Sequence, residues 1–199
     1  MSREARVAGV LLAAGRARRM KGENKLLRRI GKRSMIAAIA RRLLESGLDP
    51  LIVVVGHEAE LVKEALEDEP VIVVVNPVHG EGVSTSVKVG IAALPSDVDA
   101  VLIALGDMPK VTSAHVTRLV AAFAPDQGRA IGVPTYRGRR GNPVLWAKAF
   151  FGEMERLTGD RGARGLIEKH RDQVYEIAMG DAGVLLDIDT PDDLAGLSP

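Results

Sequence analysis

Residues 7–27 read VAGVLLAAGRARRMKGENKLL, a continuous apolar run that leads directly into a loop rich in glycine and cationic side chains. An apolar run of this length is typical of a strand buried on both faces of a parallel sheet. Ligands of open α/β sheets bind beyond the carboxyl ends of the strands. The stretch therefore predicts a parallel α/β fold with a ligand-binding loop at the exit of its first strand.

Three more apolar runs follow the first, at residues 51–55, 71–75 and 101–105, and each is expected to be buried on both faces. Apolar residues at helical spacing separate the runs and continue after them, in the segments 36–43, 61–66, 87–94 and 116–123. Thr112 and Ser113 are natural caps for the last of these helices. The alternation predicts an α/β fold of the Rossmann-like kind, a mostly parallel sheet with helices on both faces.

The pattern loosens after Pro125, where we expect an antiparallel excursion or an edge strand. The strands predicted in this half of the chain lie at residues 130–134, 142–146, 174–178 and 184–189. A short helix is predicted at residues 191–197, with Thr190 as its N-cap and Pro191 at its first position.

Composition limits the possible classes of protein. The chain has 199 residues, 46% of them hydrophobic and 27% charged, which predicts one globular domain over residues 1–199. It contains no cysteine, so disulfides and thiolate sites are excluded. Aromatic residues make up 3% and the net charge is +1, so nothing calls for a nucleic acid or a membrane as partner. The apolar run at residues 7–15 is too short to span a bilayer, and we expect a cytoplasmic protein.

The loop after the first run is strongly basic. Nine cationic residues lie within 18 positions: Arg16, Arg18, Arg19, Lys21, Lys25, Arg28, Arg29, Lys32 and Arg33. One interpretation is a solvated basic face. The preceding strand favours another, in which Gly15 lets the backbone approach a phosphate while Arg19 and Lys25 balance its charge. The spacing fits neither the Walker P-loop nor G-x-G-x-x-G, which weakens the ATPase and dinucleotide-dehydrogenase interpretations.

Carboxylates follow two of the predicted strands. Asp107 stands in a Gly-Asp-x-Pro turn directly after the run 101–105, where it could hold Mg²⁺ or only hydrogen-bond its own turn. Asp187 and Asp189 would share a face if their strand continues. Asp192 and Asp193 fall in the first turn of the predicted terminal helix, where they complement the helix dipole.

Two further segments are rich in small and polar residues. Residues 76–90 read NPVHGEGVSTSVKVG, which suits nucleotide contacts or ordinary helix capping by Ser84. Residues 158–166 read TGDRGARGL and place Arg161 and Arg164 in one glycine-rich turn before a helix. That turn suits an anionic substrate group, or it is a simple surface turn. The four histidines have no metal-ligand spacing.

Several motifs in order resemble one family, the MobA-like nucleotidyltransferases. They are Leu12-Ala-Ala-Gly15 with Arg19-Met20 and Lys25, Gly106-Asp-Met-Pro109, Gly141-Asn-Pro-Val-Leu145, Gly159-Asp-Arg-Gly-Ala-Arg164 and Asp187-Ile-Asp-Thr-Pro191. Together they look most like the MocA branch, the molybdenum cofactor cytidylyltransferases. Ala17 stands where that family usually has a serine, so a hydroxyl contact to the nucleotide is absent there.

The resemblance implies a Mg²⁺-dependent transfer of a nucleotide from CTP, or another NTP, to a molybdopterin-type phosphorylated acceptor. It implies the catalytic residues Arg19, Lys25 and Asp107, and the metal ligands Asp107 and Asp189 with Asp187 in reserve. The nucleotide-binding residues it implies are Leu12, Ala13, Ala14, Gly15, Arg19, Lys25, Asn76, Ser84 and Gly106. The acceptor-binding residues are Gly159, Asp160, Arg161, Gly162 and Arg164. A molybdoenzyme that receives the cofactor is a further possible partner.

Two alternatives stay open at this point. The chain could transfer a nucleotide to another phosphorylated acceptor, or it could be a non-catalytic protein of molybdenum cofactor maturation. For the cytidylyltransferase that the resemblance implies, CTP is expected over GTP because the methyl groups of Ala13 and Ala14 leave less room beside the base than glycine would.

Overall fold

The computed structural model describes residues 5–15, 24–188 and 193, and all structural statements refer to these residues. The main sheet has eight strands, with the order β10-β7-β9-β6-β1-β4-β5 and with β8 paired to β7. Its strands are β1 (Val7–Ala13), β4 (Leu51–Val55), β5 (Ile72–Val75), β6 (Ala100–Leu105), β7 (Ile131–Tyr136), β8 (Arg139–Arg140), β9 (Val144–Ala147) and β10 (Val174–Ala178). A separate hairpin joins β2 (Arg29–Ile30) to β3 (Arg33–Ser34).

The pairing confirms the predicted mostly parallel sheet. β1 lies at the centre and pairs in parallel with both β4 and β6, and β4 pairs in parallel with β5. β9 runs antiparallel to its two neighbours, β6 and β7, while β10 is parallel to β7. The antiparallel excursion expected after Pro125 is therefore β9, inserted between two parallel groups of strands.

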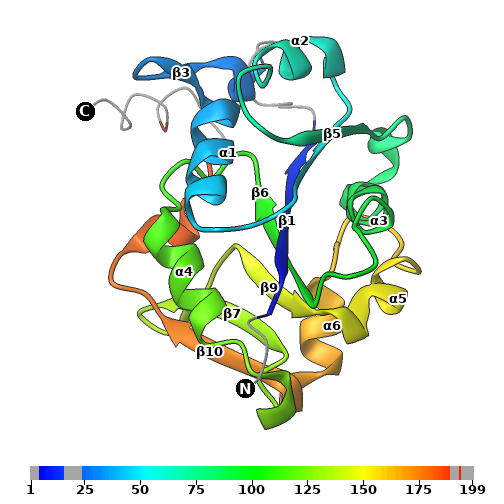
Figure 1. The fold of residues 1–199 in the computed structure, drawn as a ribbon, viewed down its shortest axis with the longest axis vertical. Helices are drawn as coiled ribbons and strands as arrows, with labels where there is room; N and C mark the ends of the chain where they lie inside the picture. The colour runs from blue at the N-terminus through cyan, green and yellow to red at the C-terminus, as the bar shows by residue number, and fades with distance from the viewer. Residues whose placement is uncertain (1–4, 16–23, 189–192, 194–199) are drawn as a thin grey trace.

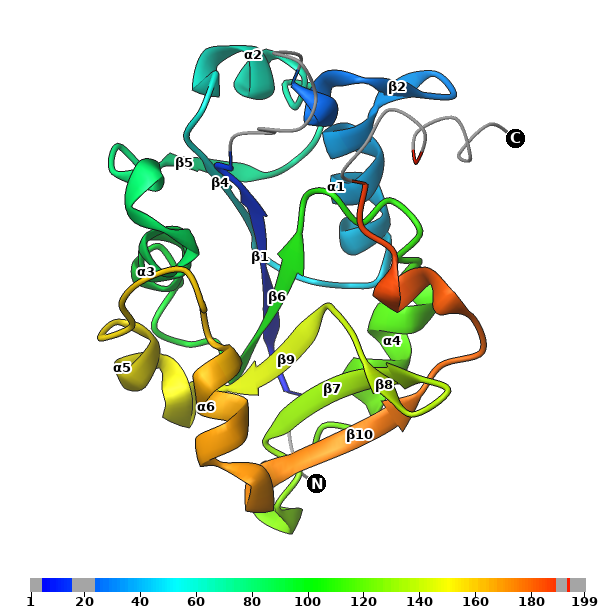
Figure 2. The same cartoon turned by 180° about the vertical axis from the view of Figure 1, so that it is seen from behind.

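Helices cover both faces of the sheet. Those described are α1 (Met35–Glu45), α2 (Ala59–Glu64), α3 (Val83–Ala92), α4 (Ser113–Ala121), α5 (Phe151–Met154) and α6 (Arg164–Lys169). The short 3-10 helices are η1 (Lys25–Leu27), η2 (His79–Glu81), η3 (Pro125–Gln127), η4 (Lys148–Phe150), η5 (Arg171–Gln173) and η6 (Ala182–Leu185). Figures 1 and 2 show α1 and α4 on one side of the sheet and α3, α5 and α6 on the other.

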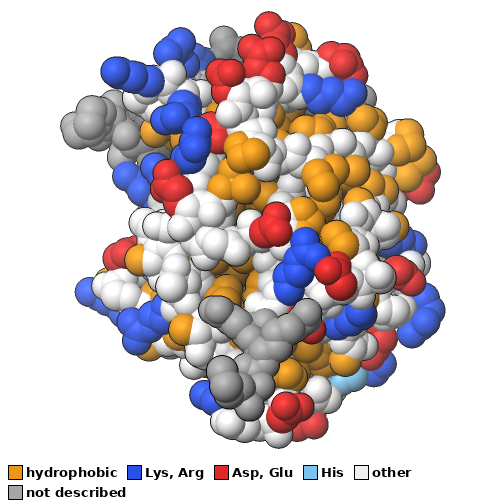
Figure 3. All heavy atoms as spheres, viewed as in Figure 1, with side chains coloured by type: hydrophobic (Ala, Val, Ile, Leu, Met, Phe, Trp, Pro, Cys, Tyr) orange, Lys and Arg blue, Asp and Glu red, His pale blue; other side chains and the backbone are white. Residues whose placement is uncertain are grey.

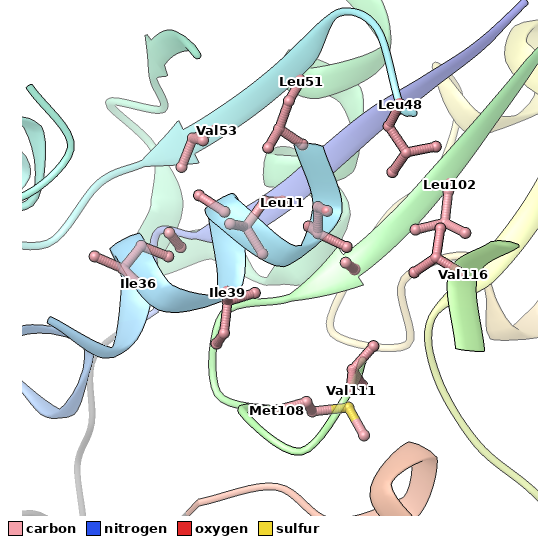
Figure 4. Packing of buried hydrophobic residues seen from close by; sticks show 14 of the residues in the cluster. Leu11, Ile36, Ile39, Leu48, Leu51, Val53, Leu102, Met108, Val111 and Val116 are labelled. Atoms are coloured by element: carbon pink, nitrogen blue, oxygen red, sulfur yellow. The ribbon is translucent and has the colours of Figure 1, made fainter. Parts of the chain in front are cut away.

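Two hydrophobic clusters hold these layers together. Because side chains alternate along a strand, β1 sends Leu11 to the cluster under α1 and α4 and Val10 to the cluster under α3. Figure 4 shows part of the first cluster, in which Leu11 and Ile39 lie near each other and Leu102 lies beside Val116. As predicted, Thr112 caps α4, since its side chain accepts a hydrogen bond from the amide of His115.

Three expectations about the elements need correction. The run 71–75 is not buried on both faces: β5 lies at the edge of the sheet, where Ile72 is 50% exposed. The strand expected at 184–189 is not formed in its described part, residues 184–188, because η6 continues to Leu185 and residues 186–188 have no regular structure. Ser84 does not cap α3, whose N-cap is Gly82.

The predicted terminal helix at 191–197, with its cap Thr190, lies outside the described residues except for Asp193, which is helical. Within the described ranges, no helix is both long enough and apolar enough to cross a membrane.

Candidate active site

The turn that follows β6 brings Asp107 to the carboxyl edge of the sheet. The amide of Gly106 donates a hydrogen bond of 2.9 Å to the carbonyl of Leu12, so this turn lies against the end of β1. A Cβ at Gly106 would lie 3.0 Å from that carbonyl oxygen, which explains the glycine. Met108 and Val111 are buried and point into the core (Figure 4), and they anchor the turn. Asp107, between Gly106 and the anchored Met108, keeps 28% of its side chain exposed.

Lys25 comes from η1 and meets Asp107 at this edge. Asn24 caps η1 through a 3.1 Å bond from the amide of Leu26, whose buried side chain fixes the turn. The Lys25 Nζ donates to Asp107 Oδ2 at 2.9 Å and to the carbonyl of Ile188 at 2.6 Å. The amide of Ile188 in turn donates to the carbonyl of Asp107 at 2.8 Å. Three segments that are far apart in the sequence therefore converge on one ammonium–carboxylate pair.

The pair has the chemistry of a phosphate and cation site. Lys25 is a compact cation whose side chain is 12% exposed, so a phosphate could approach it without full competition from water. Asp107 offers hard carboxylate oxygens of the kind that Mg²⁺ prefers. Within the described ranges no three His, Asp or Glu side chains group closely enough to cage a metal. The donor set there fits an ion held by one or two carboxylates together with substrate phosphates.

A cavity of about 720 Å³ opens on the face of the sheet covered by α3 and α6. Leu12 and Leu105 line it. Leu105 lies two residues before Asp107, and the Leu12 carbonyl accepts the hydrogen bond from Gly106 in the same turn. Its opposite wall carries Asp160, Arg161, Gly162 and Arg164. The sheet side contributes Trp146, and the loop before β9 contributes Asn142. The cavity is therefore large enough for a small-molecule ligand and has cationic groups on one wall.

Glycines hold that wall against the beginning of α3. Gly82 has a φ of +118°, and a Cβ there would lie 2.6 Å from Asp160 Oδ1 and 2.8 Å from the Gly159 carbonyl oxygen. The amide of Ser84 donates to the same carbonyl at 3.3 Å. Gly159 and Gly162 also have positive φ angles, of 74° and 52°. The loop can follow this path because its tight positions carry no side chain.

Two of the three arginines that line the cavity, Arg140 and Arg161, are paired with carboxylates. Arg161 NH2 lies 3.6 Å from Glu168, and Arg140 Nε donates to Glu176 at 2.7 Å. Both pairs are largely exposed, so each is weak and could exchange its carboxylate for a substrate anion.

The residues at the end of β1 and at the start of the loop after it differ in where they lie. Leu12 lines the cavity, whereas Ala13 and Ala14 are only 2% and 3% exposed, with their methyl groups inside the two clusters. A nucleotide base would therefore meet their backbone more than their side chains. Gly15 is exposed, and none of the described residues comes within 4 Å of the place a Cβ would take there. Open space at Gly15 suits the close approach of a ligand.

Asn76 and Ser84 are buried, at 0% and 1% exposure. The Asn76 amide donates to Thr85 Oγ1 at 2.8 Å and to Ser86 Oγ at 3.0 Å, and its oxygen accepts from the amide of Val78 at 3.1 Å. These bonds tie the end of β5 to α3, so any effect of Asn76 on a nucleotide would pass through the backbone that it fixes.

Some expected site residues are not close together or not described. Arg19 and Asp189 lie outside the described residues. Asp187 is exposed and belongs to no strand, so the strand on which it was expected to share a face with Asp189 is not formed at Asp187. Gly159 is not part of the cavity lining, although it shapes the loop that is.

The structure adds residues to which sequence reasoning gave no role. Arg140, Asn142 and Trp146 line the cavity, and the Ile188 carbonyl binds Lys25. The motif Gly141-Asn-Pro was the available signal for the first group. A Cβ at Gly141 would lie 2.1 Å from the Val184 carbonyl oxygen, which shows why the motif begins with glycine. No local signal marks a backbone carbonyl such as that of Ile188.

A buried histidine connects α4 to the segment that leads to Ile188. His115 Nε2 lies 3.1 Å from Asp181 Oδ2, and its Nδ1 accepts from the Thr112 amide at 3.2 Å. The pKa of Asp181 lies below its ordinary value, mainly because its carboxylate accepts a hydrogen bond from the amide of Gly183, with His115 adding to the effect. The contact fixes η6 beside the turn that holds Asp107.

Comparison with known proteins identifies the family. Residues 9–174 match the MobA-like NTP transferase domain. Among curated proteins, PucB, a purine catabolism protein of Bacillus subtilis, is 30% identical over 93% of this chain and 92% of its own. Nicotine blue oxidoreductase of Paenarthrobacter nicotinovorans is 29% identical over 92% of each chain. The chain also matches the bifunctional protein GlmU of Kineococcus radiotolerans at 34% identity, but spans only 34% of its length.

Solved structures agree with this assignment. Rv0371c of Mycobacterium tuberculosis superposes with a TM-score of 0.84 at 32% identity, over 98% of both chains, and it has also been solved in complex with manganese. A nucleotidyl transferase of Methanothermobacter superposes with a TM-score of 0.83 at 26% identity, over 96% of this chain and 95% of its own. The chain belongs to the family of MobA-like NTP transferase domains and is a nucleotidyltransferase.

Proposed function

We propose that the protein transfers CMP from CTP to a phosphorylated acceptor of the molybdopterin type. The observation that carries the proposal is the position of the Lys25–Asp107 pair, at the same strand ends whose residues Leu12 and Leu105 line the cavity. A nucleotide at the pair and an acceptor in the cavity would then face each other across the carboxyl edge of the sheet.

In the proposed reaction, an oxygen of the acceptor phosphate attacks the α-phosphorus of CTP in line. The bond between the α-phosphorus and its bridging oxygen to the β-phosphate breaks, and pyrophosphate leaves. This chemistry depends on positioning and on neutralising charge more than on a covalent catalyst. Lys25, with Arg19 of the same loop, would balance the charge of the triphosphate, and Arg161 and Arg164 would hold the acceptor phosphate.

We assign Asp107, together with Asp189, to a divalent cation, with Mg²⁺ as the expected ion. The partly exposed Asp107 carboxylate fits this assignment, and so does the manganese complex of the related Rv0371c. When bound, the ion would supply positive charge to the phosphates of the nucleotide. Lys25, which contacts Asp107 Oδ2, would keep the carboxylate oriented toward the edge.

A panel of pyrophosphate-release assays tests the proposal, with CTP, GTP and ATP each combined with molybdopterin and with simple phosphorylated acceptors. The expected result is release with CTP and molybdopterin, and slower release with GTP. This preference rests on the resemblance to the MocA branch, because the buried methyl groups of Ala13 and Ala14 do not crowd a base as the sequence had suggested. Equal turnover with GTP would refute the choice of nucleotide. Turnover only with a simple phosphorylated acceptor would mean that the acceptor belongs to that class and is not molybdopterin. Binding without turnover in every combination would support the non-catalytic alternative.

A further inference from the structure

A second, smaller hollow lies between the β2–β3 hairpin and α1, with a volume of about 250 Å³. We call it the hairpin pocket. Its charged lining consists of Lys32, Arg33, Arg41, Arg42 and Glu45. None of its lining residues belongs to the large cavity. Figure 3 shows Lys and Arg side chains gathered over this part of the molecule, at the upper left around β3 and α1.

Two of its arginines form ion pairs with one buried carboxylate, Glu69. The side chain of Glu69 is 2% exposed and lies 3.4 Å from Arg33 Nε and 3.1 Å from Arg41 Nε. Both arginines thus approach Glu69 through Nε, and not through the terminal nitrogens of the guanidinium. Within the described part of the chain, Arg41 Nε and Glu69 Oε2 are buried without a hydrogen-bond partner of good geometry, so these contacts are ion pairs. A guanidinium carries five donors, so most of the donors of both groups remain for another acceptor.

The charge of the pocket favours an anion. Four cationic side chains and one carboxylate, Glu45, line it, and the buried Glu69 pairs with two of the cations, so cations outnumber carboxylates by two to one. Like charges gathered in a concavity raise the local concentration of anions. The planar fork of a guanidinium matches two oxygens of a tetrahedral oxyanion, and the ion pairs with Glu69 hold the Arg33 and Arg41 side chains near the pocket. The volume is below the roughly 300–1,000 Å³ of pockets for drug-sized ligands, which indicates a small ion or one terminal group.

We propose that the hairpin pocket is a second anion site, which binds phosphate or the phosphoryl group of a small molecule. It lies outside the cavity but borders the turn that carries Asp107, because the Arg42 guanidinium also donates to the carbonyl of Pro109. The guanidinium of Arg42 would then bind both the anion and the carbonyl of Pro109 in the turn that carries Asp107. The proposal does not depend on the nucleotide or acceptor proposed above.

Titration of the whole chain with inorganic phosphate tests the proposal, without nucleotide and at an ionic strength fixed with NaCl. Calorimetry or ³¹P line broadening would give the dissociation constant. Lys32→Glu reverses an exposed charge of the pocket, and Arg156→Glu is its matched control on the exposed surface beyond α5. We expect Lys32→Glu to weaken phosphate binding about tenfold and Arg156→Glu to change it less than twofold.

A third variant separates this site from the active site. Lys25→Ala removes the phosphate-binding cation of the first loop, and it should leave the binding that depends on Lys32 in place. Thermal unfolding confirms that each variant is folded. Binding that is lost in Lys25→Ala but unchanged in Lys32→Glu would place phosphate at the active site alone and overturn the proposal. Equal weakening by Arg156→Glu and Lys32→Glu would overturn it as well, because the attraction would then be one of overall charge.

Discussion

Lys25 is the residue on which the active-site geometry depends most, since its ammonium group holds both the Asp107 carboxylate and the Ile188 carbonyl. We expect Lys25→Ala to reduce the rate of pyrophosphate release by about 10²-fold, comparable with the loss of one preorganised donor to a transition state. Lys25→Arg should restore only part of this rate, because a planar fork does not replace a compact ammonium.

The control for Lys25 is Lys63→Ala, which removes an exposed lysine paired with Glu60 on α2. It should leave the rate unchanged. Unfolding curves measured beside the assays should show that Lys25→Ala stays folded. If Lys25→Ala kept both its rate and its nucleotide affinity, the first loop would be the solvated basic face considered at the outset.

Asp107 is the carboxylate that the structure places at the strand edge, whereas Asp187 is exposed and in no strand. We expect Asp107→Asn to abolish turnover that depends on Mg²⁺ or Mn²⁺, with little loss of stability, because asparagine keeps the size of the side chain. Asp189→Asn should behave alike. Asp187→Asn is the comparison variant and should lower the rate by a smaller factor. Metal titrations with CTP present decide this, and normal metal dependence in Asp107→Asn would remove Asp107 from the ion site.

At the scale of elements, the acceptor wall depends on how closely the 159–164 loop approaches α3. Gly82→Ala would place a methyl group 2.6 Å from Asp160 Oδ1, at a φ of +118°. We expect a loss of about 1–3 kcal/mol in the free energy of unfolding and a raised KM for the acceptor, with less change in the KM for the nucleotide.

Gly80→Ala is the matched control for Gly82→Ala. Gly80 lies two residues before Gly82, and no described residue lies within 4 Å of where a Cβ at Gly80 would be. It should leave both the stability and the acceptor KM close to those of the parent protein. Steady-state kinetics and chemical denaturation would measure the two effects. A Gly82→Ala variant with parental values of both quantities would show that the loop moves away from α3 without cost.

The contact between α4 and η6 gives the protein a component of acid sensitivity. The pKa of Asp181 is lower in the folded protein than its value of about 4 in an unfolded chain. Its contribution to the free energy of unfolding is therefore complete above about pH 4 and is lost as the pH falls through the folded-state pKa. Asp181→Asn should lower stability at neutral pH and flatten the stability profile in acid. Because the carboxylate is largely exposed, the effect should be small. Identical acid profiles of the two proteins would contradict this assignment.

Considering the whole molecule, the sequence predicted the central strands well and the outer parts less well. The runs at β1, β4 and β6 are buried as expected, because each is flanked by two strands and covered by helices. The run at β5 has the same composition but lies at the edge. Strand order decides which run is exposed, and no local pattern records that order.

The sequence also predicted some parts of the site better than others. Asp107 could be chosen from the sequence because it stands directly after a predicted strand, and Lys25 because it belongs to the basic loop that follows the first strand. The topology of the sheet brings the exits of its strands together. The segment 184–189 could not be predicted correctly, since its apolar residues favoured a strand. In the structure Asp181 is the N-cap of η6, because its side chain accepts a hydrogen bond from the amide of Gly183. Gly183 packs so closely on the turn after β6 that a Cβ there would lie 2.5 Å from the Lys110 carbonyl oxygen. Packing against a distant turn therefore overrides the local preference.

One contact between distant parts of the chain tests how far the fold as a whole supports the site. Gly141 packs on the Val184 carbonyl, and the amide of Asn142 donates to that oxygen at 2.9 Å. This joins the strand region β7–β9 to η6, which leads to Ile188 and so to Lys25. Because a Cβ at Gly141 would lie 2.1 Å from a backbone oxygen, the backbone must move in Gly141→Ala.

We expect Gly141→Ala to cost about 2 kcal/mol in the free energy of unfolding, which lowers the Tm by roughly 4–8 °C in a chain of this length. The rate of pyrophosphate release should fall more than the stability alone explains, because displacing η6 draws the Ile188 carbonyl away from Lys25. Gly152→Ala in α5, where a Cβ meets nothing within 4 Å, is the control and should be neutral or slightly stabilising. Calorimetry and the release assay, run on both variants at a temperature where each is folded, separate the two effects. A Gly141→Ala protein with lowered Tm and an unchanged rate would show that the Lys25–Asp107 pair does not need the Ile188 carbonyl.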